Sequence, residues 1–558
     1  MNRNATLRTA ALALLLAPLA AQAQQTIVVT NDVTSNTTWT AGNTYLLNGL
    51  IFVDNGATLT IEPGTVVKGR AAANITSGEF ASALIIKRGA KIEANGTAAA
   101  PIIMTAENDD LNNPNDRLPT ERGLWGGLIV LGSAPTNTGV TDNAVEGIPE
   151  ANNAFYGGTN ADDDSGTIRY VSIRHGGADL NDDDEINGLT LGGVGSGTEI
   201  EYVEVFANLD DGIEWFGGTV DVKYAVVAYS GDDSFDYAQG WDGNGQFWLV
   251  VQAPDDSDSA GEFDNLPENN AATPLTTPVV SNGTFIGPGQ NPSGGGSRIL
   301  RFREGAGGSF YNSVLAAGRS AAITFEGDVT KGLIGTENLT IRNNVIGTNF
   351  GAGATFAQLV TGASSEQTSA LAALNSVRDA GIVVTTGDLD GDPANNEELI
   401  SVVVSRFTTS ELPEAAFDDI ANLDDDFFTE VDYVGAINPD VATQFYTGWT
   451  FLDQVGVFTV QGGVDNEGGP LAEALALSVG PNPAAGDATV RFTLDRAQAV
   501  RVALYDVLGR EVAVVADGTF GVGEQAATVS TGALPAGLYV LRLEAEGVTA
   551  TRQLSVVR

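Results

Sequence analysis

The sequence predicts an all-β protein with two parts, a right-handed parallel β-helix and, after it, a small immunoglobulin-like β-sandwich. An internal repeat predicts the β-helix, because the segment that begins at Tyr202 recurs at Tyr224 without a gap. A repeat of 22 residues, with short β-branched and aromatic runs between Gly, Asn and Asp, is typical of one solenoid turn. About seven short alternating strands after Leu477 predict the sandwich. An antiparallel sandwich in the middle of the chain is the alternative, but it does not explain a gap-free repeat.

The composition excludes several classes of function. The chain has 558 residues, with 27 Lys and Arg against 71 Asp and Glu, and a net charge of −44. It therefore lacks the clustered basic residues that nucleic acids and anionic membranes require. Because it has no Cys and one His, disulfides, thiolate nucleophiles and multi-histidine metal sites are excluded, and oxygen ligands would hold any metal. The length predicts two or more domains.

Residues 1–23 have the pattern of a secretory signal peptide. Two arginines precede an apolar run at residues 10–20, and an Ala-Gln-Ala end predicts cleavage between Ala23 and Gln24. The run is much shorter than the ~20 residues of a membrane span. We therefore expect an exported chain without a transmembrane segment.

The predicted β-helix runs from residue 24 to about residue 350. Residues 57–69 and 90–106 alternate apolar and polar side chains, with Gly at the corners. Further copies of the repeat share its apolar spacing and begin at Tyr170 and Gln246, with looser copies at residues 281–287, 311–318 and 341–347.

The register is expected to end after Phe350, with an irregular insertion at about residues 351–430. Within this insertion, helical spacing of apolar residues predicts an amphipathic helix over residues 364–380. The residues with this spacing are Leu371, Leu374 and Val377.

The β-helix passenger is expected to span residues 24–460. Its aromatic-rich stretch at residues 433–452 is predicted to close the end of the solenoid, where the last turn would otherwise expose unpaired strand edges. Gly-rich residues 461–475 then predict a linker before a C-terminal domain at residues 476–558.

Stacked aspartates predict a calcium site. Asp211 and Asp233 occupy the same position in two copies of the repeat, and Asp179 and Asp255 are expected to take that position in the flanking copies. Carboxylates stacked about 5 Å apart repel one another and have raised pKa values unless a cation screens them. Ca²⁺ accepts six to eight oxygen ligands in loose geometry and suits such a row. A solvated acidic turn is the alternative, since Asp favours turns.

Asp388, Asp390 and Asp392 form a second candidate calcium site. Their alternation is like that of a calcium loop. The Gly falls at the fourth place and no Glu falls at the twelfth, so the segment is not an EF-hand. Calcium is the only cofactor that the sequence leads us to expect.

The same aspartates allow an enzymatic interpretation. Residues 208–212 and 231–233 resemble segments of polygalacturonase-like glycosidases, which share this fold. The resemblance implies a glycoside hydrolase or lyase in which Asp211, Asp232 and Asp233 protonate the glycosidic oxygen and activate water. The His that those enzymes carry one turn later is absent. We therefore assign no catalytic residue and keep a polysaccharide-degrading enzyme as the alternative.

Four aromatic residues lie close together in the repeat. If these side chains face outward, they form platforms on which sugar rings stack. If they face inward, they belong to the hydrophobic core. We predict core, because two of them alternate with Glu214 and Asp236. The four residues are Trp215, Tyr237, Trp241 and Trp248.

Few basic side chains are available to act with the aspartates of the repeat. Arg298, Arg301 and Arg303 either contact an anionic sugar or neutralise nearby acids. His175 is the only candidate base for Ser-His-Asp catalysis, and we predict a structural role for it.

The C-terminal residues carry the most specific motifs of the chain. Pro481, Asn482 and Pro483 stand at the start, followed by a segment at residues 504–512 with Gly509 and by one at residues 534–547. Together with Gly537, Tyr539 and Arg552, these motifs closely resemble the C-terminal sorting domain of the type IX (Por) secretion system of Bacteroidetes-like bacteria. Arg552 stands where the family usually has Lys, so the cation is kept.

That resemblance implies a route and a location. The chain would cross the inner membrane by its signal peptide and the outer membrane by the type IX machinery, and reach the medium or the cell surface. In the family the sorting domain is typically cleaved, and the passenger is released or attached to surface lipopolysaccharide. Residues 98–105 and 122–132 also resemble words of secreted Bacteroidetes β-helix passengers with a pectate-lyase-like fold.

We therefore expect an exported surface protein with a binding, adhesin-like or structural role. Its expected partners are the secretion machinery, surface lipopolysaccharide and extracellular glycans. Solenoids of this kind also include enzymes, so the fold does not choose between the two roles.

Overall fold

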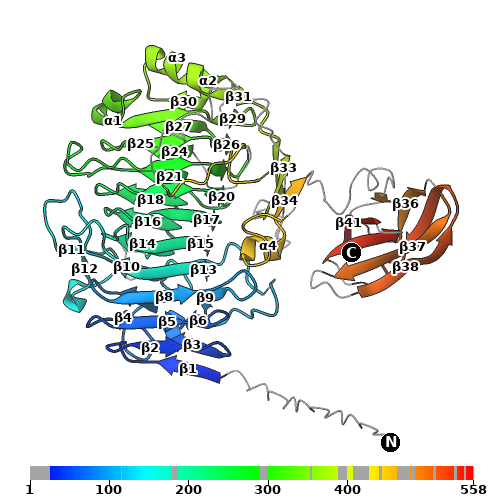
Figure 1. The fold of residues 1–558 in the computed structure, drawn as a ribbon, viewed down its shortest axis with the longest axis horizontal. Coiled ribbons are helices and arrows are strands. Elements are labelled where there is room, and N and C mark those ends of the chain that lie inside the picture. The colour runs from blue at the N-terminus through cyan, green and yellow to red at the C-terminus, as the bar shows by residue number, and fades with distance from the viewer. Residues whose placement is uncertain are drawn as a thin grey trace, which may run out of the picture.

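The computed structural model describes residues 25–556 with several gaps, so the predicted cleavage site at Ala23 and Gln24 lies outside the described residues. The gaps are residues 115, 179–185, 290–293, 295–297, 352, 354, 388–398, 406–425, 439–440, 442, 462–477, 481–483, 485, 495, 507–510, 533, 535–536 and 546–547. The described residues confirm the fold class: a parallel β-helix precedes antiparallel sheets (Figure 1).

Each turn of the β-helix contributes strands to three faces. The first face contains β2 (Thr37–Trp39), β5 (Thr58–Ile61), β8 (Lys91–Asn95), β19 (Asn244–Gln246), β22 (Val279–Ser281), β25 (Gly308–Tyr311) and β28 (Leu339–Arg342). The second contains β1 (Gln25–Val29), β3 (Asn43–Leu47), β6 (Val66–Gly69), β9 (Ile102–Ala106), β20 (Leu249–Val251), β23 (Thr284–Ile286), β26 (Val314–Ala316), β29 (Val345–Gly347) and β31 (Ser376–Arg378). The third contains β4 (Leu50–Val53), β7 (Ala83–Ile86), β10 (Leu128–Leu131), β14 (Leu189–Gly192), β16 (Ile213–Phe216), β18 (Phe235–Ala238), β21 (Ser259–Phe263), β24 (Arg298–Phe302), β27 (Ala321–Phe325) and β30 (Val360–Thr361).

Three long strands join the first and second faces through a corner. They are β13 (Gly166–Arg174), β15 (Glu199–Phe206) and β17 (Val222–Ala228). At the corner, Tyr170, Tyr202 and Tyr224 have φ angles of 48°, 55° and 60°. The left-handed conformation is costly for a bulky residue, but each ring stacks on the next, with centroids 4.3 and 4.4 Å apart. The stacking confirms the predicted repeat of 22 residues between Tyr202 and Tyr224.

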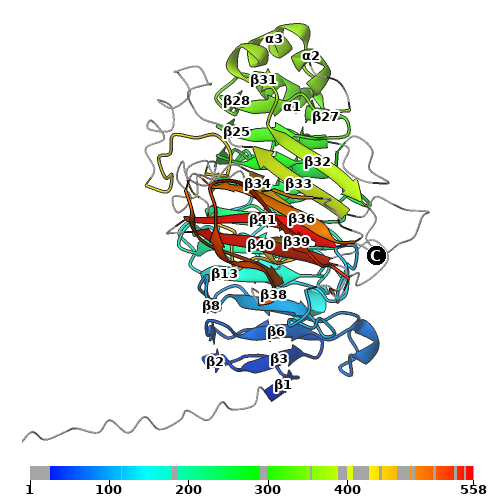
Figure 2. The same ribbon diagram turned by 90° about the vertical axis from the view of Figure 1, so that its right-hand side faces the viewer.

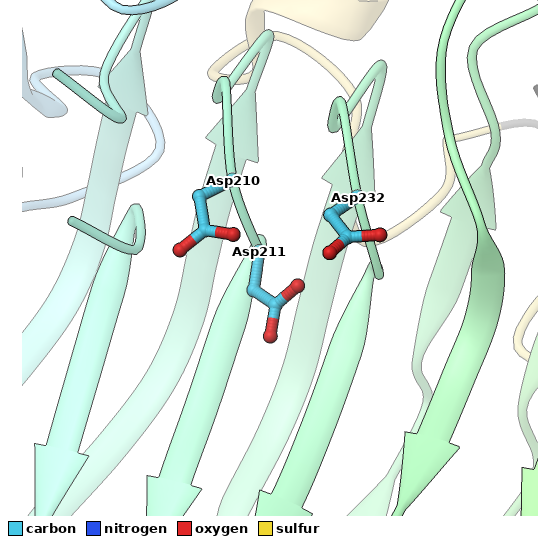
Figure 3. A group of neighbouring side chains, drawn as sticks. All are labelled: Asp210, Asp211 and Asp232. Carbon is cyan, nitrogen blue, oxygen red and sulfur yellow. The ribbon is translucent and has the colours of Figure 1, made fainter. Parts of the chain in front are cut away.

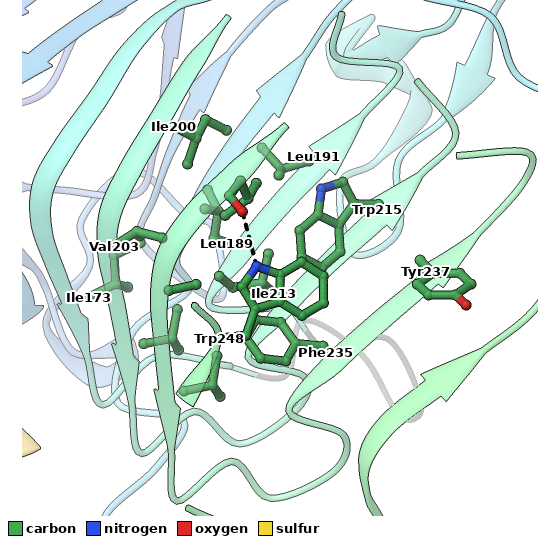
Figure 4. Packing of buried hydrophobic residues seen from close by; sticks show 14 of the residues in the cluster. Ile173, Leu189, Leu191, Ile200, Val203, Ile213, Trp215, Phe235, Tyr237 and Trp248 are labelled. Carbon is green, nitrogen blue, oxygen red and sulfur yellow. Dashed lines mark hydrogen bonds between the residues drawn. The ribbon is translucent and has the colours of Figure 1, made fainter. Parts of the chain in front are cut away.

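The predicted aromatic core is confirmed. The side chains of Trp215, Tyr237, Trp241 and Trp248 are fully buried. Trp215 stacks on Trp241 and Trp248, with ring centroids 4.6 and 5.4 Å apart. Figure 4 shows Trp215 and Trp248 packed beside Phe235 among aliphatic side chains of neighbouring turns. These aromatic rings fill the interior and leave no sugar platform at these four positions.

The β-helix continues beyond Phe350, contrary to the prediction. β29 pairs with β31, and β27 pairs with β30, so one more turn forms. The predicted helix is shorter than expected: α3 spans Ser365–Leu374, because Val377 pairs with Ile346 in the sheet. Leu371 of α3 is buried in the main core.

Helices, and not residues 433–452, lie at this end of the solenoid. Figure 2 shows α1 (Asp328–Leu333), α2 (Phe356–Leu359) and α3 at the end opposite β1. Leu359 and Leu371 bury their side chains in the core there. The minor elements of the β-helix are β11 (Asn143–Ala144), β12 (Phe155–Tyr156) and the 3₁₀ turns η1 (Ala72–Asn74) and η2 (Glu150–Asn152).

The described residues of 426–461, here called the strap, pack along the flank of the β-helix. The strap includes α4 (Phe451–Val455) and β34 (Phe458–Gln461), which pairs with β33 (Leu399–Ser405) beside β32 (Ile382–Gly387). The strap lies there because apolar side chains such as Phe206 and Leu249 point out of the β-helix on this flank. The strap buries them, and together they form a second hydrophobic core. The ring of Trp449 also packs nearly perpendicular to that of Tyr170, with centroids 5.4 Å apart.

A buried carboxylate fastens the strap to the β-helix. Glu204 on β15 is fully buried, and its two oxygens accept hydrogen bonds from the backbone N–H groups of Phe451 and Leu452 at 2.7 and 2.9 Å. Ser172 donates to the same carboxylate at 2.5 Å and accepts from Arg174 Nε at 2.8 Å. The Arg174 guanidinium lies 4.5 Å from the centroid of the Phe451 ring.

The described residues of the C-terminal part form a seven-stranded antiparallel sandwich with its own core. One sheet contains β35 (Ser478–Gly480), β36 (Ala488–Leu494) and β39 (Gly523–Val529), and the other β37 (Gln498–Asp506), β38 (Glu511–Phe520), β40 (Gly537–Ala545) and β41 (Val548–Val556). Gly537 begins β40, Tyr539 is buried, and Arg552 is exposed on β41 opposite Leu541. Pro481, Asn482, Pro483 and Gly509 lie outside the described residues.

Candidate functional site

Eight carboxylates form a continuous lattice on three successive turns of the third face. Glu214, Asp236 and Glu262 are paired in register on β16, β18 and β21. Two further rows lie at the turns before these strands, and Figure 3 shows Asp210, Asp211 and Asp232 there on neighbouring turns. Neighbouring members of the lattice bring carboxylate oxygens within 4.8 Å of one another. The acidic lattice consists of Asp210, Asp211, Glu214, Asp232, Asp233, Asp236, Asp258 and Glu262.

Asp255 is not part of this lattice, so its predicted register is wrong. Phe235 pairs with Gly261, 26 residues later, because this repeat has four more residues than the previous one, one before β19 and three between β20 and β21. Asp258 and Ser259 therefore follow Asp232 and Asp233, as the bond from the Ser259 N–H to Asp233 Oδ1 shows. Asp255 instead forms a two-pronged ion pair with Arg122, at 2.8 and 2.9 Å.

Asp211 and Asp233 each support the next turn of the backbone. Both side chains are buried, at 6% and 3% exposure. Asp211 Oδ1 accepts a hydrogen bond from the Asp233 N–H at 2.9 Å, and Asp233 Oδ1 accepts one from the Ser259 N–H at 2.5 Å. Burial and the neighbouring carboxylates raise the pKa of both groups. The predicted stacking of Asp211 and Asp233 is thus present, and their role as calcium ligands stays a prediction.

Glu214 and Asp236 point away from the aromatic core but are still shielded from water. Glu214 is 7% exposed and accepts a hydrogen bond from Asn187 Nδ2 at 2.5 Å. Burial, followed by like charges, raises the pKa of Glu214 and Asp236 well above the usual range. Sequence reasoning missed both residues as site candidates, although the 22-residue repeat already places Asp236 after Glu214.

The three arginines bind lattice acids on the next turn. Arg298 pairs with Asp258 at 3.0 Å, and Arg303 contacts Glu262 and also pairs with Asp264, outside the lattice, at 2.8 Å. Arg301 contacts Asp258, Glu262 and Glu326. These ion pairs support the interpretation that the arginines neutralise nearby acids.

The remaining predicted residues fall outside this site. Asp179, Asp388, Asp390 and Asp392 lie outside the described residues. His175 is fully buried at the end of β13, and its Nδ1 lies 2.7 Å from the carbonyl oxygen of Glu121. Its ring packs against Phe206 and Phe451, which fits a structural role.

We expect the stability of the chain to depend on pH through Asp232. Desolvation, followed by the charge of Asp258, raises the pKa of Asp232 to about 6, against about 3.9 in an unfolded chain. Because the folded state binds this proton more tightly than the unfolded chain, the contribution of Asp232 to the free energy of unfolding is fully present below pH ~4. It is lost as pH rises through about 6. The variant Asp232→Asn, which mimics the protonated form, should therefore gain stability relative to wild type over this range.

Urea unfolding at pH 4, 5, 6 and 7 in a buffer with a chelator measures this effect. Asp328→Asn is the control, because Asp328 is exposed on α1 and away from the lattice. If the difference in the free energy of unfolding between Asp232→Asn and wild type does not change with pH, the prediction is contradicted.

Two family models match the chain. The pectate-lyase-like beta helix domain matches residues 31–383, and the secretion system C-terminal sorting domain matches residues 478–557. None of the curated proteins matches significantly. Within the part of the chain that the structure describes, no helix has the length and apolar character to cross a membrane. The chain therefore belongs to the pectate-lyase-like β-helix family and carries a C-terminal sorting domain, which marks it for secretion or display at the surface of a Bacteroidetes-type bacterium.

Proposed function

We propose that the β-helix is an adhesin-like binding protein that recognises extracellular glycans at the cell surface. The observation that supports binding over catalysis is the position of Asp211 and Asp233. Both carboxylates are buried and each accepts a backbone hydrogen bond from the next turn. A catalytic acid or base must reach the bond that it cleaves, whereas these two groups brace the solenoid.

The net charge of −44 narrows the class of glycan. A strongly acidic protein repels polyanions and attracts neutral or cationic partners. Asp232 is exposed at the lattice, beside Asp258, and these two carboxylates would accept hydrogen bonds from sugar hydroxyl or amino groups. We therefore assign neutral or amino-sugar-containing glycans as the ligand class.

A glycoside hydrolase is the second candidate, and Asp232 is the observation that favours it. Its pKa is raised to about 6, the range in which a carboxyl group can act as a general acid near neutral pH. Oxygens of Asp232, Asp233 and Asp258 lie within 4.8 Å of one another, so two carboxyl groups are close enough for a retaining mechanism.

Glycan binding and reducing-end release distinguish the two functions. The mature protein should bind neutral or amino-sugar polysaccharides without releasing reducing ends, and Asp232→Asn should weaken this binding about tenfold, because it removes charge-assisted hydrogen bonds. Asp328→Asn is the matched control. Release of reducing ends that disappears in Asp232→Asn would make the protein a hydrolase, and absence of binding to every glycan would refute the proposal.

A further inference from the structure

Three carboxylates of the acidic lattice converge on one point. Asp211 stands before β16, Glu214 lies on β16, and Asp236 is its partner on β18. One oxygen from each lies within 4.8 Å of the others. Among the described residues, no Lys, Arg or His comes within 4.0 Å of these three carboxylates. Three negative charges are thus gathered in a shielded place without a basic partner, which is costly unless a cation joins them.

An unpaired oxygen on a buried amide that contacts Glu214 is a second, independent sign of a ligand. Asn187 precedes Asp211 by one turn in register, because Leu189 pairs with Ile213. The Asn187 side chain is 1% exposed, and its Nδ2 donates to Glu214 Oε2. Its Oδ1 has no hydrogen-bond donor among the described residues, and neither has Asp236 Oδ1. Buried oxygens without donors are rare in folded proteins, because losing their hydrogen bonds to water destabilises the folded state.

We propose that Asp211, Glu214 and Asp236, together with the Asn187 amide oxygen, bind one calcium ion between neighbouring turns of the β-helix. All four ligands are oxygens. Ca²⁺ and Mg²⁺ bind oxygen ligands, whereas transition metals such as Zn²⁺ and Cu²⁺ favour nitrogen and sulfur ligands. Ca²⁺ is favoured over Mg²⁺ because it tolerates irregular geometry and mixed carboxylate and amide ligands. The inference does not depend on the glycan-binding function proposed above.

The neighbouring group of carboxylates does not need a metal. Asp233, Asp236 and Glu262 also lie close together, but Glu262 already contacts Arg301 and Arg303. Two guanidinium groups therefore supply the positive charge there. The calcium ion belongs one turn earlier, where the described residues offer no such group.

Calcium titration of the mature protein with its sorting domain tests this site. We expect wild type to bind Ca²⁺ in equilibrium dialysis and to lose thermal stability in EDTA, with recovery when Ca²⁺ is restored. Asp236→Asn should reduce the affinity more than about 100-fold, and Asn187→Ala about 10- to 100-fold, as for other groups that complete or orient a metal site. Asp328→Asn, on exposed α1, should bind as wild type does.

The outcomes separate this site from the others in the chain. Equal calcium binding by wild type, Asp236→Asn and Asn187→Ala would place the ion elsewhere and refute the site. No binding by wild type at millimolar Ca²⁺, with the same melting temperature in EDTA, would show that the carboxylates share protons and would also refute it. If Asp236→Asn does not fold, Asn187→Ala decides, because it keeps all three carboxylates. Glycan binding is measured separately, so failure of one proposal does not imply failure of the other.

Discussion

Deletion of residues 478–558 should abolish delivery of the β-helix to the cell surface. The sorting domain matches residues 478–557 and forms its own sandwich with a separate core. The main core of the β-helix contains no residue of the sandwich. The truncated passenger should therefore still fold, and should accumulate inside the cell envelope instead of at the surface. Cell fractionation and surface labelling, in a bacterium that carries this secretion system, measure the change.

A reciprocal fusion is the control for this deletion. Residues 462–558 attached to an unrelated exported reporter should direct the reporter to the surface. Tyr539→Ala in the fusion should reduce this delivery, because Tyr539 is buried in the sandwich core and large-to-small core changes cost several kcal/mol. Surface display of the truncated passenger at wild-type levels would contradict the assigned role.

Glu204→Ala should release the strap from the β-helix. The change removes a fully buried carboxylate that accepts from the N–H groups of Phe451 and Leu452. It also removes the negative charge that most favours the charged form of the buried Arg174. Loss of one side of a buried charged network costs about 3–5 kcal/mol. Hydrogen exchange of the two amides and limited proteolysis of residues 426–461 measure the effect.

Glu201→Ala is the matched control on the same strand. The Glu201 side chain is 32% exposed and lies 3.6 Å from Arg169, so its loss should change stability by less than about 1 kcal/mol. Glu204→Gln should fall between the two, because an amide oxygen still accepts one backbone hydrogen bond but carries no charge. Equal proteolysis of Glu204→Ala and Glu201→Ala would show that the apolar contacts alone hold the strap.

Local sequence patterns were sufficient where the structure itself repeats. Tyr202 and Tyr224 stack as predicted, and Trp215 and Tyr237 pair in register within the core. In a parallel β-helix, equivalent residues of successive turns are neighbours, so the spacing of the sequence is also the spacing of contacts. The sandwich was predictable for a related reason. Apolar and polar residues alternate along each of its strands, and its family motifs follow one another along the chain.

The repeat failed as a guide where a turn changed length. Four additional residues, one before β19 and three between β20 and β21, moved Asp255 out of the lattice and placed Asp258 in it, with Ser259 in register with Asp233. A turn can lengthen without disturbing the strands on either side, because loops tolerate insertions. The spacing of aspartates alone therefore could not identify the third row of acids.

The sequence by itself determined the C-terminal sorting domain, the fold class, the repeat and the acidity of one corner. Only the tertiary structure decided which acids meet, that Glu214 and Asp236 join Asp211 beside Asn187, and that residues 433–452 cover the flank instead of the end. The physical reason is the range of the interactions involved. Strand periodicity and stacking act between equivalent positions and can be read along the chain, whereas desolvation, charge pairing and strap packing depend on residues that only the folded chain brings together.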